Sequence, residues 1–152
     1  MKKLRLAVSA ITMAAGLTLG LAGSASASGV YNLVNEGTGA CLDSNDNGDV
    51  YVIYCNGGAY QRWSWDGGST AGSTGRLVNV ATGRCLDSNE YGNVYTLPCN
   101  GGANQQWSAY LNVPGWAYQN NATGLWLHAM GQTRIQTDSG RSAGVSGYGW
   151  HN

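Results

Sequence analysis

The chain contains no phenylalanine and only two prolines, and beyond residue 27 no segment keeps the 3.6-residue apolar period of an amphipathic helix. The missing period argues against a helical fold. The large apolar residues are instead six tryptophans and nine tyrosines, which bury much area but carry a polar atom that needs a partner. Together with 24 glycines, this composition favours an all-β fold of short strands and tight turns.

Positive charge is also scarce. Both lysines lie at the start of the chain, and beyond residue 27 five arginines stand against eight acidic residues, a net charge of 5 − 8 = −3. Nucleic-acid binding needs clustered positive charge, so we expect no nucleic-acid partner. A basic amphipathic helix that could lie on a membrane is missing too, and we expect no membrane insertion of the mature chain.

The first 27 residues have the form of a secretory signal peptide. Lys2, Lys3 and Arg5 precede an apolar run over residues 6–21, and Ala25–Ala27 has the A-x-A form of a cleavage site. A membrane helix is the competing reading, but the run is short and no basic stop-transfer flank follows it. We therefore expect a secreted, extracellular protein whose mature chain, 28–152, begins near Ser28 and forms one domain.

Residues 38–63 are repeated at 82–107 without a gap, with 17 of 26 positions identical. A third, weaker copy follows, in which Asn120 and Leu127 lie 41 residues after Asn79 and Leu86 (120 − 79 = 41). A period of about 40 residues is typical of repeat architectures, and a unit this short cannot bury its own apolar face. We expect units of about 30–72, 73–113 and 114–152, with some four short strands each, around a shared pseudo-threefold core.

The repeat also identifies the expected core. Equivalent apolar positions of the three units should form its layers, and Trp63 and Trp107 should pack inside them, while Gln61 and Gln105 bind nearby backbone groups. These apolar positions are Leu42, Leu86 and Leu127, with Val50, Val94 and Ile135.

Four cysteines in an exported chain predict two disulfides, for which three pairings are possible. We favour Cys41–Cys55 and Cys85–Cys99, because each of the first two units then has its own equivalent bridge. A zinc site is disfavoured, since the cysteines lack C-x-x-C spacing and both histidines lie in the third unit.

A Gln-x-Trp pattern that closes units of this length, in register with Thr-Gly-x-Cys-Leu-Asp, resembles the ricin B-type lectin family. The likeness covers almost all of units one and two and only the skeleton of unit three. It implies a β-trefoil, with glycans as partners, mannose-rich glycans first among them, and with no cofactor.

The resemblance also implies a sugar pocket in each unit. It uses the Asp of Leu-Asp-Ser-Asn, the Tyr of Val-Tyr, an apolar residue two further on, the Asn before Gly-Gly, and the Tyr before Gln-x-Trp. Unit one matches throughout, with Asp43, Tyr51, Ile53, Asn56 and Tyr60. Unit two has Asp87, Tyr95, Leu97 and Asn100, but Asn104 at the last position. Unit three has His128 and Gln136 at the first two positions, and no Asn-Gly-Gly.

These residue types suit a pyranose. A carboxylate accepts hydrogen bonds from neighbouring hydroxyls, an amide donates and accepts beside it, and a tyrosine ring covers the apolar C–H face. The alternative for Asp43 and Asp87 is a role in a turn of the Ser/Asn-rich loop, and the Asn-Gly-Gly segments are good turns by themselves.

Two other kinds of site are disfavoured. Asp43-x-Asn45-x-Asn47-Gly48 copies half of a calcium loop, but Tyr54 stands where a bidentate glutamate is required, so we expect no metal. His128 and His151 are the only imidazole bases, and no two carboxyls are placed to flank a glycosidic bond, so we expect no catalytic residues and no enzyme.

The sequence thus predicts a secreted, monomeric lectin with its main site in unit one and a weaker or differently selective site in unit two. A module for xylan or galactosides is one alternative. A secreted inhibitor or interaction protein is another, in which the divergent stretch from Met130 to Trp150 binds a protein partner.

Overall fold

A computed structural model of the chain describes residues 29–112, 115–140 and 146–152. The predicted signal peptide lies outside the described residues. Each unit contributes strands and one short 3₁₀ turn. The first has β1 (Gly29–Asn32), β2 (Val34–Asn35), β3 (Cys41–Ser44), β4 (Val50–Ile53), η1 (Ala59–Gln61) and β5 (Arg62–Trp65). The second has β6 (Ser73–Gly75), β7 (Leu77–Asn79), β8 (Cys85–Ser88), β9 (Val94–Leu97), η2 (Ala103–Gln105) and β10 (Trp107–Asn112). The third has β11 (Gly115–Asn120), β12 (Trp126–Met130), β13 (Arg134–Asp138), η3 (Ser146–Tyr148) and β14 (Trp150–His151).

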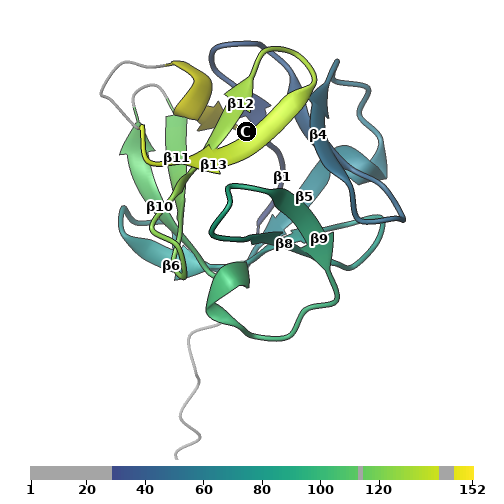
Figure 1. Cartoon of the computed structure of the whole chain (residues 1–152). Helices are drawn as coiled ribbons and strands as arrows, with labels where there is room; N and C mark the ends of the chain where they lie inside the picture. The colour runs from purple at the N-terminus through teal and green to yellow at the C-terminus, as the bar shows by residue number, and fades with distance from the viewer. Residues whose placement is uncertain (1–28, 113–114, 141–145) are drawn as a thin grey trace, which may run out of the picture.

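The closing strand of each unit pairs with the strand that precedes the inner hairpin of the next unit. β5 pairs with β7, β10 with β11, and β14 returns to β2, so the chain of pairings closes on itself. The inner strands of each unit form a hairpin, β3–β4, β8–β9 and β12–β13. Figure 1 shows these parts arranged around one centre, with the three units following one another in colour. The expected all-β fold with threefold pseudosymmetry is confirmed.

The core is built from equivalent residues of the three units. Leu42, Leu86 and Leu127 are fully buried, and the predicted second layer of Val50, Val94 and Ile135 is only partly buried and packs against this core. Trp63 and Trp107 are fully buried, and each indole N–H donates to a leucine carbonyl at 2.9 and 3.0 Å. The tryptophans therefore fill the core with their polar atoms satisfied, as their position in the repeat predicts.

A buried asparagine binds each unit to the one before it. Asn79 is fully buried, and its amide donates to the carbonyl of Tyr60 at 2.7 Å. Its side-chain oxygen accepts from the backbone N–H groups of Ala81 and Thr82 at 3.1 and 3.2 Å, which holds the turn that follows. Asn120 repeats the arrangement toward the carbonyl of Asn104.

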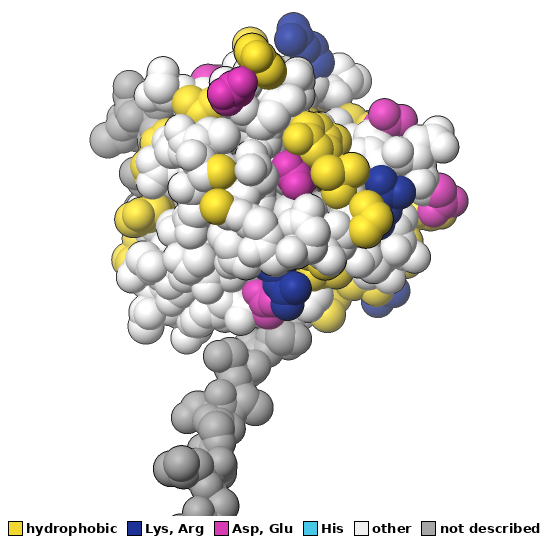
Figure 2. All heavy atoms as spheres, turned by 60° about the horizontal axis from the view of Figure 1, so that its bottom comes forward, with side chains coloured by type: hydrophobic (Ala, Val, Ile, Leu, Met, Phe, Trp, Pro, Cys, Tyr) yellow, Lys and Arg dark blue, Asp and Glu magenta, His cyan; other side chains and the backbone are white. Residues whose placement is uncertain are grey.

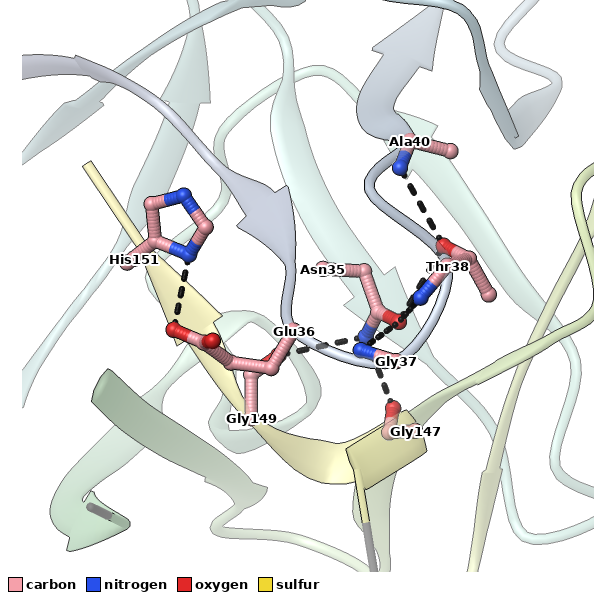
Figure 3. A network of polar contacts seen from close by, with 8 residues as sticks. All are labelled: Asn35, Glu36, Gly37, Thr38, Ala40, Gly147, Gly149 and His151. Carbon is pink, nitrogen blue, oxygen red and sulfur yellow. Dashed lines mark hydrogen bonds and ion pairs between the residues drawn. The ribbon is translucent and has the colours of Figure 1, made fainter. Parts of the chain in front are cut away.

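At the junction of the third unit with the first, Asn35 donates to the carbonyls of Gly147 and Gly149 at 2.9 and 3.2 Å (Figure 3). Beside it, Glu36 and His151 form an ion pair with the Nδ1 and Oε1 atoms 2.7 Å apart. The third and first units are thus joined by the same asparagine contact that joins consecutive units.

In units one and two, a Gln-x-Trp glutamine and a disulfide fix the segment that follows the second hairpin strand, β4 or β9. Gln61 is fully buried, accepts from the backbone N–H of Asn56 at 2.7 Å and donates to the carbonyl of Tyr54 at 3.0 Å. The predicted disulfides are confirmed: Cys41 bonds to Cys55 and Cys85 to Cys99, each with a Cα–Cα distance of 5.0 Å. The same loop is therefore held covalently and by hydrogen bonds.

The first prediction concerns the junction asparagine. Asn79→Ala leaves the Tyr60 carbonyl and two backbone N–H groups without partners, and each unsatisfied buried group costs about 1–3 kcal/mol, so we expect a loss of roughly 3 kcal/mol or more. Urea unfolding followed by tryptophan fluorescence measures it. Asn47→Ala, an exposed asparagine in a loop, is the control and should stay within about 0.5 kcal/mol of the parent. Equal midpoints for the two variants would contradict the assignment.

The second prediction concerns the disulfides. Each closes a loop with a sequence separation of 14 residues, so its removal by Cys41→Ala/Cys55→Ala should cost about 3 kcal/mol in the chain-entropy description. The matching double variant Cys85→Ala/Cys99→Ala should lose a similar amount, because the two loops are equivalent. Unfolding midpoints of both variants test this, and a loss in only one of them would show that the two loops do not contribute alike.

Candidate functional site

The predicted site of unit one is built on the β3–β4 hairpin. Asp43 and Tyr51 are register partners on the two strands. Burial, followed by the negative charge and hydrogen bond of Asp43, raises the pKa of Tyr51. Asp43 itself is only 3% exposed, and Tyr51 is half-buried.

Tyr60 of η1 joins this pair. Tyr60 is 39% exposed, and the η1 turn that carries it packs against β3, the strand of Asp43. The Tyr60 hydroxyl donates to Asp46 Oδ2 at 2.9 Å, and this hydrogen bond raises the pKa of Tyr60. The ring is thus held in one orientation by a carboxylate from the β3–β4 loop.

Asn56 is exposed and stabilises its own turn. Its side-chain oxygen accepts the backbone N–H of Gly58 at 2.7 Å, and its own N–H binds the side chain of Gln61, the neighbour of Tyr60. Gly57 has a φ of +71°, which glycine adopts without strain. Ile53 is half-buried and lies opposite Cys41. The structure therefore places Asp43 and Tyr51 opposite each other, sets the η1 turn of Tyr60 against β3, and gives Asn56 the turn role that its sequence also suggested.

Unit two repeats the hairpin pair and changes the rest. Tyr95 stands opposite Asp87, which is 4% exposed, and burial and this carboxylate raise the pKa of Tyr95. Asn100 holds its turn through the N–H of Gly102 at 2.8 Å. Leu97 is 39% exposed. Asn104, in the place of Tyr60, donates to the Ser88 carbonyl at 2.6 Å, so the aromatic wall of unit one is missing here.

Unit three contains a different polar cluster. Asp138 accepts from Tyr148, from Gln136 at 3.0 Å and from the Gly140 N–H at 3.0 Å, and pairs with His128 Nδ1 at 2.7 Å. Burial alone would raise the pKa of Asp138, but these hydrogen bonds outweigh it and lower the pKa to about 2. Burial and then Asp138 raise the pKa of Tyr148 to about 12. The rings of His128 and Tyr148 stack with centroids 4.0 Å apart.

The sequence aligned His128 and Gln136 with the first two pocket positions of a third site that was expected to be lost, and it did not indicate Asp138 or Tyr148. The register offers a signal for both. Asp138 stands opposite Trp126, as Ile53 stands opposite Cys41, so an acid replaces the apolar residue of the pocket pattern. Tyr148 lies two residues before Trp150, where units one and two have the glutamine of Gln-x-Trp.

The part of the chain that the structure describes contains no group of three or more His, Cys, Asp or Glu side chains that could hold a metal ion. In the calcium-like segment, Asn45 is already engaged, since it accepts the Asp49 N–H and donates to the Asp49 carboxylate at 3.0 and 2.9 Å. None of the described helical segments is long and apolar enough to cross a membrane. On the face seen in Figure 2, Lys and Arg side chains lie apart from one another among mostly uncharged surface.

This arrangement can bind a neutral, hydroxyl-rich ligand. In unit one, an edge of the Asp43 carboxylate can accept hydroxyl protons, and the Tyr51 and Tyr60 rings offer apolar faces beside it. A cation beside this site, the Arg84 guanidinium, is engaged by the Asp46 and Thr96 carbonyls at 3.3 and 2.8 Å. The carboxylate and the tyrosine rings suit a carbohydrate contact.

The chain matches the family model described as the ricin-type beta-trefoil lectin domain over residues 29–143. It belongs to this family. Membership supports a carbohydrate-binding role, with glycans as the general class of partner.

Solved structures share the fold. The designed threefold-symmetric protein ThreeFoil has a TM-score of 0.68 and 24% identity, over 80% of this chain and 96% of that chain. An exo-beta-1,3-galactanase from Clostridium thermocellum has a TM-score of 0.67 and 25% identity, over 80% of this chain and 29% of the enzyme. A Polyporus squamosus lectin, bound to a human-type influenza-binding epitope, has a TM-score of 0.66 and 16% identity, over 82% of this chain and 48% of the lectin. This chain thus spans less than half of either natural protein.

The third prediction concerns Asp138. Because its pKa is lowered from 3.8 to about 2 in the folded protein, it stabilises the fold above pH 3.8, and this contribution is lost as the pH falls toward 2. Asp138→Asn should be less stable than the parent at neutral pH and lose less stability between pH 4 and pH 2. Urea midpoints measured from pH 2 to 7 test this, with the exposed Asp49→Asn as control. An acid-induced loss in Asp138→Asn as large as in the parent would contradict it.

Proposed function

We propose that the protein is a secreted, non-enzymatic, monomeric lectin that binds mannose-rich glycans through units one and two. The observation that carries the proposal is the Asp43–Tyr51 pair of the first hairpin, with the η1 turn of Tyr60 packed against β3. The repeated pair Asp87 and Tyr95 supports a second, altered site. Unit one is the main site because Tyr60 adds an aromatic wall where unit two has Asn104.

The preference for mannose rests on sequence resemblance. The strings Leu-Asp-Ser-Asn-x-x-Gly-x-Val-Tyr and Asn-Gly-Gly-x-Tyr-Gln-x-Trp, both complete in unit one, look like those of actinohivin, a small actinomycete lectin for high-mannose glycans. Xylan or galactosides are the alternative ligands within the lectin class. A glycan array that includes branched mannose, xylan fragments and galactosides separates these three.

Binding strength depends on the number of sites engaged at once. Each site offers a carboxylate edge and one or two aromatic faces, so a single sugar is held weakly. Linking the sites through one branched glycan raises the overall affinity without any new contact. A branched oligosaccharide should therefore bind much more tightly than free mannose, and removal of either site should reduce this difference.

The rival proposal from another class places function in the divergent third unit, from Met130 to Trp150. Residues 141–145 of this stretch lie outside the described residues. The cluster around Asp138 favours no protein partner by itself, since its polar groups bind one another. A protein captured in a pull-down that no sugar competes away would support this rival.

The fourth prediction tests sugar binding directly. Asp43→Ala removes a charge-assisted hydrogen bond and the partner of Tyr51, which together are worth roughly 1.5–3 kcal/mol, so binding at unit one should fall about 10-fold or more. Asp87→Ala should reduce the weaker site by a similar factor. Isothermal titration with branched mannose oligosaccharides measures both, and near-ultraviolet circular dichroism checks that each variant is folded.

Asp66→Ala is the matched control. It removes a partly exposed carboxylate that pairs with Arg76 at 2.6 Å, outside every predicted sugar contact. It should change stability but leave sugar affinity unaltered. Unchanged binding by a folded Asp43→Ala, or absence of binding to every glycan on the array, would refute the lectin proposal.

A further inference from the structure

The space between one unit's β-hairpin loop and the opening turn of the next unit differs at each junction. Between units one and two this space is occupied. Tyr60 donates to Asp46 Oδ2 from one side, and Arg84 donates to the Asp46 carbonyl at 3.3 Å from the other. The Arg84 guanidinium also donates to the Thr96 carbonyl at 2.8 Å, which fixes it across the junction.

Between units two and three the corresponding space is open. The repeat places Asn104 at the position of Tyr60 and Leu125 at the position of Arg84, two smaller or uncharged side chains. Asn104 folds back to the Ser88 carbonyl at 2.6 Å instead of reaching across. The result is an open hollow of about 510 Å³ between the β8–β9 loop and the turn after β11. Its lining residues are Asn89, Glu90, Tyr91, Asn104, Ala122, Thr123 and Leu125.

Tyr91 gives this hollow an aromatic face. It is 81% exposed, although its backbone is held by Asn89, which accepts the N–H groups of Tyr91 and Asn93 at 3.0 and 3.1 Å. Unit one has Asn47 at this position. The apolar face of this exposed ring is largely in contact with water. A ligand that covers the ring would remove this apolar surface from water, which is favourable.

The hollow lies beside the second hairpin pair. Asn104, at the position that Tyr60 has in unit one, lines the hollow and donates to the carbonyl of Ser88, the residue after Asp87. A sugar held by Asp87 and Tyr95 would therefore be adjacent to the hollow through Asn104. At the first site, Tyr60 and Arg84 fill the equivalent space at the junction.

We propose that the hollow lined by Tyr91, Glu90 and Leu125 binds the second pyranose of a glycan whose first pyranose occupies the Asp87–Tyr95 site. The inference rests on the proposed lectin function. Tyr91 covers the apolar face of the second ring, and Glu90 accepts its hydroxyl protons. Site two then selects linked sugars, whereas site one, closed by Tyr60 and Arg84, binds a terminal sugar alone.

The junction of unit three with unit one contains another hollow, of about 520 Å³. It lacks the aromatic face that Tyr91 gives the hollow between units two and three. It is lined by His128, Met130, Arg134 and Gly147 among others, and includes no tyrosine or tryptophan. A side chain at Gly147 would meet His128 Nε2 at 2.5 Å, so this position cannot regain an aromatic wall without moving the histidine. The proposal is therefore confined to the second junction.

The fifth prediction uses Asp43→Asn as background, so that site one is weakened in a conservative way. In this background a mannose disaccharide should bind more tightly than mannose. Adding Tyr91→Ala should lower the disaccharide affinity about 3- to 10-fold, the range expected for one aromatic contact, and leave mannose affinity within about twofold. Tyr54→Ala is the matched control, because Tyr54 is an equally exposed tyrosine, 87%, that lies outside the hollow.

A reciprocal variant fills the hollow. Asn104→Tyr/Leu125→Arg rebuilds the arrangement of the first junction and should abolish the preference for the disaccharide.

In the parent protein, amide nuclear magnetic resonance signals of Tyr91 and Gly92 should shift with the disaccharide and not with mannose, which tests the contact without relying on any variant.

The outcomes separate the two proposals. Selective loss of disaccharide binding in Tyr91→Ala supports the inference. An equal loss for both sugars, or no loss, with Asp87→Ala still abolishing binding, overturns the inference and leaves the lectin proposal standing. No binding of either sugar by the parent protein overturns the lectin proposal and this inference with it.

Discussion

The buried asparagine that begins each unit is the contact on which the fold depends. Asn79, Asn120 and Asn35 are register partners of Trp63, Trp107 and Trp150, so each junction places a fully buried amide beside a fully buried indole. A unit of about 40 residues has too little core to be stable alone. The asparagine oxygen accepts from the turn of its own unit, and its amide donates to a carbonyl of the preceding unit. Each unit therefore needs its neighbour to satisfy a buried polar group.

Because these contacts hold the units together at every junction, the outer hairpins can differ in sequence on the same scaffold. Unit one uses Tyr60, Asp46 and Arg84 to close its junction, and unit two leaves the same space open with Asn104 and Leu125. Unit three has no disulfide between its equivalent positions, Trp126 and Gly140. It holds its third strand instead through Tyr148 and His128, which both bind Asp138. One scaffold therefore carries three surfaces of different chemistry.

The sequence predicted the fold well because the repeat is itself structural information. Equal spacing of Cys41 and Cys85, and of Trp63 and Trp107, required equivalent environments, and the two disulfides and buried indoles followed. The pocket was less predictable. Residue type alone could not show that Asp43 is 3% exposed, or that the Asn56 oxygen serves its own turn, because both depend on how the hairpin lies against η1. Asp138 was missed because no counterpart in the other units is acidic.

The third unit also shows how far such a repeat can diverge. In units one and two the buried indole N–H donates to a leucine carbonyl, but within the described residues the Trp150 Nε1 atom has no partner. A buried donor without a partner costs about 1–3 kcal/mol, and several charge-assisted bonds to Asp138 can offset a loss of this size. The polar cluster of unit three is then best understood as a structural replacement for the disulfide and glutamine contacts. The proposed sugar recognition is accordingly assigned to the first two hairpins, where the tyrosine and carboxylate pairs remain.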